Sequence, residues 1–404
     1  MRFPSLDLLA RQSLAALRRF PWTLAVGTLA AVAAIVASLS GTDEAWQRLA
    51  FVAALGLPLT IALTLLGETR GWSGGVRHLV VIGGLLGLAA FFVSWPGIER
   101  RHDAIRYFQL SAALHLCVAF LPFLGGIESI GFWQYNRRLF LGFLRAVVFS
   151  GVLYVGVAIA LGALDKLFGV EVESETYFRI WFVVAFLVNT WIFLAVVPER
   201  LRELEQDREY PRALKIFAQY ILTPLAFTYL VILLTYLVKI VAGAEWPSGW
   251  IGWLVASVSV TGLLGFLLVH PLRSDAGEAW IRTYARWLFV GLIPAALMLL
   301  VAFWKRILPY GLTEPRLLGL VLGLWLLGIA LLFTLRSGTG IRVIPVTLAA
   351  VLLLTLYGPL GLTRLSVNSQ ARRMALMLES SGPAGVRARE ASAALRFLID
   401  HNAG

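Results

Sequence analysis

The stretch PWTLAVGTLAAVAAIVASLS, residues 21–40, is twenty residues long and carries no charged side chain. An α-helix needs about 20 predominantly apolar residues to cross the hydrocarbon core of a bilayer. Arg18 and Arg19 stand directly before it, where positive charge holds a helix end at the membrane surface. We therefore interpret this stretch as a membrane-spanning helix.

Ten further stretches have the same character, so the sequence predicts about eleven spans. Their apolar residues run on without alternating, which favours helices over a β-barrel. The expected fold class is all-α, a polytopic transmembrane helical bundle. The predicted spans cover approximately residues 21–40, 48–67, 76–95, 107–125, 141–163, 178–197, 216–241, 250–270, 287–304, 317–335 and 342–362.

The composition of the whole chain agrees with this interpretation. Of its 404 residues 59% are hydrophobic and only 14% are charged, with a mean hydropathy of +0.80. Soluble domains carry roughly a quarter charged residues, so lipid must cover most of this chain. The net charge of +12 could indicate nucleic acid, but Lys and Arg lie between apolar runs and form no basic face. We expect the lipid bilayer as a partner and no nucleic acid.

The distribution of positive charge predicts the orientation. With the N-terminus inside, the inner segments hold nineteen Lys and Arg residues and the outer loops hold ten. Inner loops are enriched in positive charge, so we predict a cytoplasmic N-terminus. An odd number of spans then places the C-terminal tail outside the cytoplasm, although the six arginines of that tail oppose this placement.

Three segments follow from this pattern. Residues 1–20 read as a cytoplasmic amphipathic lead-in, because leucines alternate with arginines there. Residues 21–362 form the transmembrane domain. Residues 363–404 form a C-terminal tail with two short amphipathic helices, which Gly382 and Pro383 separate.

Polar groups inside the predicted spans are few. No Asp or Glu lies near the middle of any span, which disfavours a carboxylate proton relay. The candidate intramembrane polar residues are His115, Asn189 and Gln219. We interpret His115 as a hydrogen-bonded core or interface residue, and the two amides as interhelical hydrogen-bonding groups rather than substrate ligands. Cys117 is the only cysteine, and we predict neither a metal site nor a cofactor.

The loop from Trp304 to Arg316 is the most polar segment on the predicted outer side. A functional interpretation is an outer-face polar site. The alternative is structural: Thr313 caps a helix, Pro315 falls in its first turn, and Glu314 complements its dipole. No nucleophile and base arrangement marks any residue as catalytic. The candidate outer-face site consists of Lys239, Arg306, Tyr310, Thr313, Glu314 and Arg316.

Three stretches carry a resemblance to a known family. They are YPRALKIFAQYILTPLAFTYLVILLTYLVKI at residues 210–240, WIRTYARWLFVGLIPAALMLL at residues 280–300, and RILPYGLTEPR at residues 306–316. The sequence resembles the DUF4153 family of bacterial membrane proteins, and the tail SQARRMALMLE at residues 369–379 is similar too. The family has no assigned activity. The resemblance therefore implies a multi-pass protein of the bacterial cytoplasmic (inner) membrane, without implying a reaction.

Three functions remain open on the sequence. The first is transport or a channel-like activity, which many spans with scattered Gly and Pro favour. The second is a non-enzymatic sensory, scaffolding or envelope-assembly component with a membrane or envelope protein partner. The third, which we rank lower, is a membrane-embedded enzyme acting on lipid or envelope substrates through the outer-face residues.

Overall fold

Every regular element that the structure describes is a helix. The computed structural model describes residues 14–41, 43–124, 129–243, 250–274, 279–336, 338–379 and 384–402. Residues 1–13 of the predicted lead-in and the predicted break at Gly382 and Pro383 lie outside these ranges, whereas residues 14–19 are helical. The all-α prediction is confirmed. The chain divides into two compact units, Met1–Asp207 and Arg208–Gly404.

The first unit is organised around one long central helix, α3, which packs against α2, α4 and α5. α3 carries buried residues along most of its length, and the Asp43 side chain caps its start by accepting from the backbone N–H of Ala45. A pair of hydroxyls, Thr23 and Thr60, bonds α2 to α3 at 2.9 Å. The helices of the unit are α2 (Pro21–Ser40), α3 (Glu44–Thr69), α4 (Gly74–Ser94), α5 (Arg101–Phe120), α6 (Ser129–Phe168), α7 (Ser174–Val183) and α8 (Asn189–Leu194).

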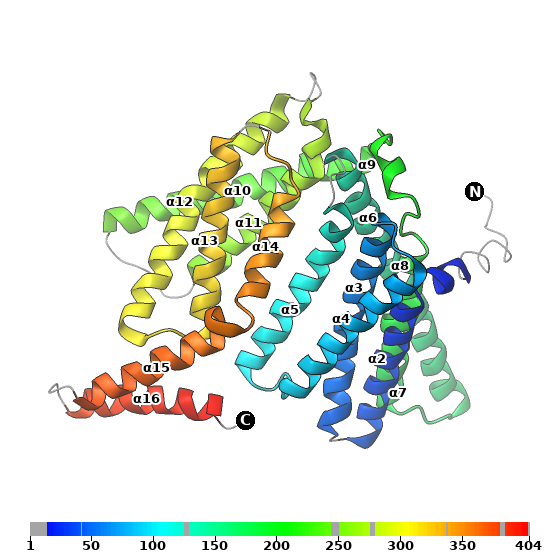
Figure 1. The fold of residues 1–404 in the computed structure, drawn as a ribbon, viewed down its shortest axis with the longest axis horizontal. Helices are drawn as coiled ribbons and strands as arrows, with labels where there is room; N and C mark the ends of the chain where they lie inside the picture. Colours follow the sequence, from blue (N-terminus) through cyan, green and yellow to red (C-terminus); the bar gives the residue numbers. More distant parts are fainter. Residues whose placement is uncertain are drawn as a thin grey trace. The chain divides into compact units, whose positions relative to one another are not determined.

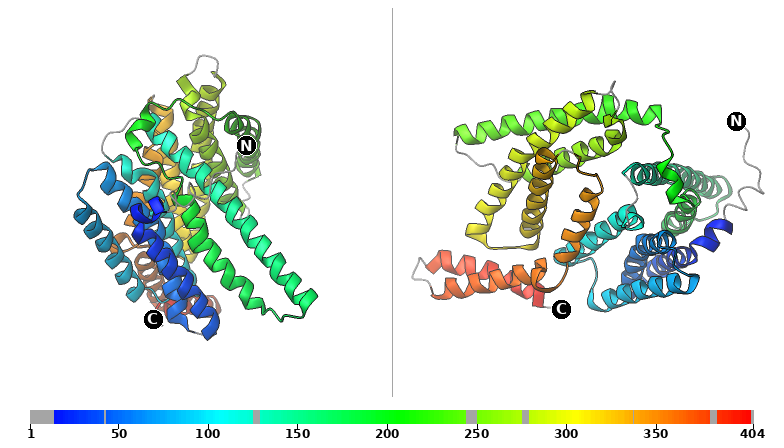
Figure 2. Two further views of the ribbon diagram at one scale, coloured as in Figure 1. Left: turned by 90° about the vertical axis from the view of Figure 1, so that its right-hand side faces the viewer. Right: turned by 45° about the horizontal axis from the view of Figure 1, so that its top comes forward.

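The second unit is organised around α12, which packs against α10, α11 and α13. Figures 1 and 2 show α15 and α16 as an antiparallel pair that runs across the ends of the longer helices of this unit. Its helices are α9 (Arg212–Phe217), α10 (Thr223–Gly243), α11 (Trp250–Val269), α12 (Ala279–Tyr310), α13 (Glu314–Leu335), α14 (Val343–Leu354), α15 (Leu362–Glu379) and α16 (Ala384–Asn402).

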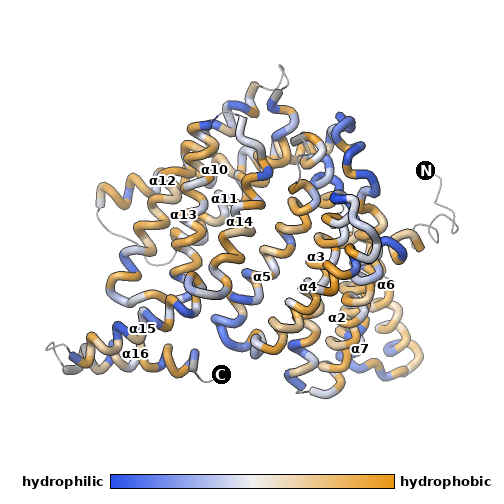
Figure 3. The backbone as a smooth tube through the Cα atoms, viewed as in Figure 1, coloured by the Kyte–Doolittle hydropathy of each residue, from blue (hydrophilic) through white to orange (hydrophobic). Residues whose placement is uncertain are grey.

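Ten helices within the described residues are long and apolar enough to cross a membrane. They correspond to the first ten predicted spans. The eleventh predicted span, residues 342–362, contains α14, a shorter apolar helix of 12 residues. Figure 3 shows hydrophobic residues along the helices and hydrophilic ones gathered at helix ends and loops.

Helix α12 is longer at both ends than the span predicted over approximately residues 287–304. It begins at Ala279, eight residues before the predicted start. At its other end α12 continues to Tyr310, six residues beyond the predicted end of the span. The helix can continue because Arg282 and Lys305 lie near its two ends and can reach water, while the apolar turns lie between them.

Two interruptions of a different kind occur inside spans. The span from Ser174 to Leu194 contains a π-helical turn at Val184–Val188, and the span from Arg212 to Gly243 contains another at Ala218–Leu222. The second turn lies directly before Thr223 and Pro224. Because proline has no backbone N–H, it cannot continue the α-helical hydrogen-bond ladder, and a π-turn is one way to accommodate that loss.

Small residues allow close helix packing at some positions and not at others. A Cβ atom on Gly27 of α2 would lie 2.8 Å from the backbone oxygen of Phe186, within the first π-turn. The Gly319 and Gly323 pair of α13 packs in the same way against Phe303 and Leu300 of α12. By contrast, Gly83 and Gly87 of α4 have no neighbour within 4 Å of such a Cβ. Gly83 and Gly87 therefore have no packing role inside the unit.

This difference predicts the effects of two matched substitutions. Gly27→Ala forces a methyl group against a backbone oxygen, which cannot move like a side chain, and we expect a loss of about 1–3 kcal/mol of stability. Gly83→Ala, in the same unit, meets open space and gains helix propensity of about 0.5–1 kcal/mol. Unfolding of purified protein in mixed micelles with rising dodecyl sulfate measures both. Equal midpoints for the two variants would contradict the packing described for α2.

Candidate functional site

The loop between α12 and α13 is a tight turn that depends on one glycine. α12 ends at Tyr310, and Gly311 has a φ of +69°, a conformation that favours glycine. The Gly311 N–H donates to the Ile307 oxygen at 2.8 Å and so closes the end of the helix. A Cβ atom on Gly311 would lie 2.8 Å from the side-chain nitrogen of Gln370, so α15 also needs this position to be bare.

Side chains of α15 hold this loop by hydrogen bonds to the backbone of the loop. Gln370 is almost fully buried, and its Nε2 donates to the oxygens of Tyr310 at 3.0 Å and Leu312 at 2.9 Å. The Ser369 Oγ accepts from the Leu312 N–H at 3.1 Å. Arg373 adds a bond from a guanidinium nitrogen to the Tyr310 oxygen at 3.3 Å. The loop is therefore fixed by side chains that lie about sixty residues further along the chain.

α16 reaches the same place through a buried ion pair. His401 Nε2 lies 2.8 Å from Glu314 Oε1, and both side chains are about 95% removed from solvent, at 6% and 4% exposure. His401 Nδ1 lies 2.7 Å from the Phe397 oxygen. Both ring nitrogens thus face oxygen atoms, an arrangement that the doubly protonated imidazolium satisfies by donating to each. We infer that His401 is positively charged in this structure.

The electrostatics at His401 agree with this charge. Burial lowers the pKa of His401, but its hydrogen bonds to Glu314 and to the Phe397 oxygen and the charges of Glu314 and Asp400 act in the opposite direction. The result is a pKa raised above the ordinary value of histidine. An opposite charge at hydrogen-bond distance favours the charged form of the histidine.

Guanidinium groups also gather at the loop. Arg316 donates to the oxygens of Tyr310 at 3.2 Å and Gly311 at 2.8 Å, and its charge lies 5.5 Å from the centre of the Tyr310 ring. Arg306 and Arg373 are both near enough to act on Arg316 electrostatically. The loop therefore has positive charge beside Tyr310, and the Glu314–His401 pair joins the start of α13 to α16.

The structure brings together most of the predicted outer-face site. Tyr310, Glu314 and Arg316 lie at the loop and make the contacts described above, and Arg306 lies within electrostatic reach of Arg316. Thr313 occupies the N-cap position of α13, but its side chain makes no capping hydrogen bond. Lys239 is exposed near the end of α10, and no polar contact joins it to the loop in the described part of the chain.

Sequence reasoning missed the residues of the tail that complete this site. Ser369, Gln370, Arg373 and His401 were not among the candidates, because the tail was interpreted only through its apolar residues. The sequence did contain a signal for them. Polar residues such as Gln370 lie on the face of α15 that the helical spacing predicts to be buried. Only the fold shows what they bond, because the partners are backbone oxygens of a distant loop.

The intramembrane candidates lie at three separate positions. His115 is exposed on α5, and its Nδ1 lies 2.8 Å from the Ser111 oxygen one turn earlier. Asn189 directly follows the first π-turn, and its side-chain oxygen accepts from Ser150 of α6 at 3.2 Å, the interhelical bond that we expected. Gln219 lies half-buried within the second π-turn. Its interhelical bond stays a prediction.

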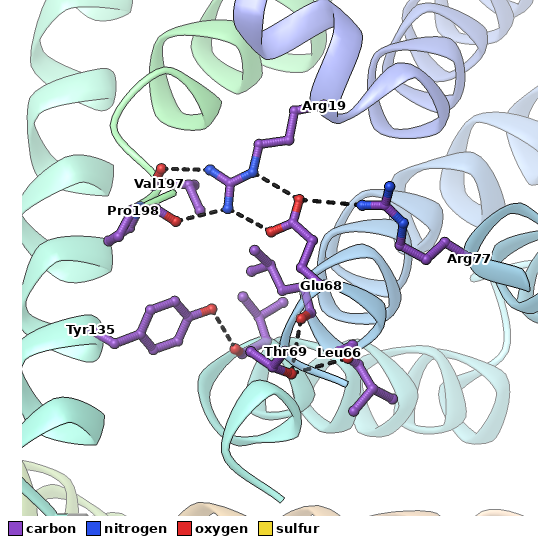
Figure 4. Close-up of polar contacts among 10 residues, drawn as sticks. Arg19, Leu66, Glu68, Thr69, Arg77, Tyr135, Val197 and Pro198 are labelled. Atoms are coloured by element: carbon purple, nitrogen blue, oxygen red, sulfur yellow. Dashed lines mark hydrogen bonds and ion pairs between the residues drawn. The ribbon is translucent and has the colours of Figure 1, made fainter. Parts of the chain in front are cut away.

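A second polar cluster, in the first unit, was also missed (Figure 4). Arg19 makes two bonds to the Glu68 carboxylate, at 3.0 and 2.8 Å. The same guanidinium donates to the oxygens of Val197 at 2.9 Å and Pro198 at 2.7 Å. Arg77 approaches Glu68 at 4.0 Å. The Glu68 carboxylate and the two backbone oxygens all serve to join segments, so we interpret this cluster as structural. It connects the start of α2, the end of α3 and the chain after α8 at one face.

An apolar pocket of about 330 Å³ lies between α10 and α12. Its wall includes Phe227 and Leu230 of α10 and Trp280 and Trp287 of α12. The hydroxyl of Thr223 at this wall is buried beside the Tyr284 hydroxyl, which donates to the Gly262 oxygen at 2.9 Å. The size matches small-ligand pockets, and the wall suits an apolar group.

Metal ligands do not cluster in the described ranges, where no three His, Cys, Asp or Glu side chains come together as a metal ion requires. Cys117 is buried as a free thiol.

Taken together, the apolar helices and the charges at their ends define a multi-pass α-helical membrane protein. Residues 24–380 match the family model described as a domain of unknown function, DUF4153. The chain belongs to the DUF4153 family.

One curated relative is an uncharacterized protein of Pasteurella multocida, 26% identical over 286 residues. The match covers 69% of this chain and 46% of the relative, so the chain spans about half the length of the curated relative that it matches. No solved structure matches the chain. The family range includes the loop and α15 and ends before α16.

The ion pair predicts that docking of α16 depends on pH. Because the pKa of His401 is raised on folding, its stabilising contribution is fully present below about 6.5, the ordinary value of histidine, and is lost as the pH rises through the raised value. Amide hydrogen exchange of residues 390–402, corrected for the intrinsic pH effect, should therefore be faster at pH 9 than at pH 6. His401→Gln should remove this difference. A pH dependence that survives in His401→Gln would show that another group is responsible.

Proposed function

We propose that this protein is a non-catalytic component of the bacterial cytoplasmic membrane that holds a helical hairpin, α15–α16, for a membrane or envelope protein partner. One observation carries the proposal. The polar groups of the loop between α12 and α13, which could have formed a reactive site, are used to hold the hairpin in place. Glu314 and both nitrogens of His401 already have partners, and little of either side chain is exposed.

The surface of the hairpin supports this role. α15 and α16 pack on each other, yet they expose large apolar side chains at Leu376, Leu378, Leu395 and Ile399. Apolar groups at such positions are typical of helices that contact another surface. A hairpin fixed by a buried ion pair presents these groups in one orientation, which reduces the entropy cost of binding.

The orientation that we propose has the N-terminus in the cytoplasm and the hairpin outside it. Polar contacts between helix ends support the alternation of spans that this requires. In the first unit, Arg19 contacts the end of α3, and Arg48 donates to the Phe92 oxygen at the opposite end of that helix, at 2.6 Å. In the second unit, the loop before α13 contacts the tail after α14. This contact supports α13 and α14 as an out-and-back pair, and we propose that α14 makes the eleventh crossing despite its length.

Single cysteines test the orientation and the partner together. In a Cys117→Ser background, Ser392→Cys on exposed α16 should react with an impermeant maleimide in intact spheroplasts, and Arg202→Cys should react only after lysis. A photo-crosslinker attached at Ser392→Cys should then capture one defined membrane or envelope protein in cells.

Undocking the hairpin provides the control. His401→Ala leaves the Glu314 carboxylate buried and unpaired, which costs about 3–5 kcal/mol and should release α16. This variant should lose the crosslink, and Arg200→Ala, which removes an exposed ion pair of the first unit, should keep it. If Ser392→Cys captures no protein, or if the crosslink is equally strong in His401→Ala, the proposed role of the docked hairpin is wrong.

A second candidate, transport of an apolar or amphiphilic solute, is favoured by the pocket between α10 and α12. If the pocket holds the solute, Thr283→Trp should fill it from the rim and reduce uptake into proteoliposomes at least several-fold. Val290→Trp, on the same helix and exposed but not lining the pocket, should leave uptake unchanged. Equal uptake by both variants would remove the support for this candidate. The enzyme hypothesis has no comparable observation in its favour.

A further inference from the structure

Positive charge around the loop between α12 and α13 exceeds the negative charge that faces it. Arg316 and Arg373 both donate to the Tyr310 oxygen, and Arg306 lies within electrostatic reach of Arg316. Arg373 shares the Glu390 carboxylate at 3.5 Å, and Glu314 is taken by His401. In the part of the chain that the structure describes, no carboxylate pairs with Arg306 or Arg316. Like charges held together in a half-buried place repel, and an anion would relieve that repulsion.

The backbone of the loop fixes two of these groups, Arg316 and Arg373, before any ligand arrives. Arg316 is held by two backbone oxygens, and Arg373 is mostly buried and bonds the Tyr310 oxygen. Gln370 in turn fixes the same loop from α15. Guanidinium groups suit phosphate well, because their N–H donors match the spacing of its oxygens. A fixed arrangement loses little entropy on binding.

The side chains beside the cluster indicate its depth in the membrane. At the end of α12, Trp304, Leu308 and Tyr310 are all exposed. Trp and Tyr concentrate at the boundary between hydrocarbon and headgroups, so this end of α12 lies at headgroup level. The cluster formed by Arg306, Arg316 and Arg373 is therefore at the height of lipid phosphates, with an apolar surface beside it for the acyl chains.

We propose that Arg306, Arg316 and Arg373 form a binding site for the phosphate of an anionic phospholipid, with Trp304 and Leu308 contacting its acyl chains. The site is separate from the pocket between α10 and α12, because it lies at the other end of α12. It also does not depend on the proposed partner of the hairpin. It would place an anionic lipid against the base of α15, where it would add to the contacts that hold the loop and the hairpin together.

Thermal unfolding of the full-length protein in neutral detergent tests the proposal. Added short-chain phosphatidylglycerol should raise the unfolding temperature, and phosphatidylcholine of the same chain length should not. Arg306→Gln should weaken the apparent affinity for phosphatidylglycerol about five-fold, since each basic group near an anionic lipid contributes about 1 kcal/mol. Arg306 is the best position to change, because the described fold does not use its side chain for a hydrogen bond.

Two controls keep the interpretation specific. Arg336→Gln, an exposed arginine at the opposite end of α13, should bind phosphatidylglycerol like the unchanged protein, and Arg306→Lys should retain most of the affinity. If Arg306→Gln and Arg336→Gln respond equally, the cluster is not the site. If inorganic phosphate at the same concentration produces the full shift, the lipid assignment is wrong, because the acyl chains then contribute nothing.

Discussion

Hydrocarbon offers no hydrogen-bond partner to a peptide group, and this constraint governs the whole molecule. In lipid, the backbone N–H and C=O groups of each segment must hydrogen-bond to one another, so runs of apolar residues form helices. The same constraint moves charged groups to helix ends, where water or another polar group can reach them. The ion pairs Arg19–Glu68 and His401–Glu314, which join segments far apart in sequence, accordingly lie at helix ends.

The two polar clusters use the same chemistry for different tasks. Arg19 joins two segments and the start of a helix by bonding one carboxylate and two backbone oxygens. Around the loop between α12 and α13, backbone oxygens again accept from side chains, but here the donors belong to a tail that could otherwise separate from the membrane domain. A protonated histidine completes that contact, and its raised pKa makes the contact sensitive to pH.

The π-turns show where the helical constraint is relaxed. One lies before Pro224, whose missing N–H is a local cause, and Asn189 directly follows the other, in which the Phe186 oxygen faces Gly27. Both turns shift the backbone register without leaving the helix, as π-turns at functional positions often do. In this protein the first turn packs against a neighbouring helix, and the second stands at the apolar pocket between α10 and α12.

The sequence by itself determined the fold class, ten of the spans and most residues around the loop. Hydropathy and charge placement are local properties of a segment, and they directly determine whether that segment inserts into a bilayer. It did not determine that α12 runs unbroken from Ala279 to Tyr310, nor that Gly83 packs against nothing, since both depend on neighbouring helices. Only the tertiary structure decided that Gln370 and His401 belong to the loop. Their partners lie 58 to 87 residues away, and no local pattern specifies which acceptor a buried donor will meet.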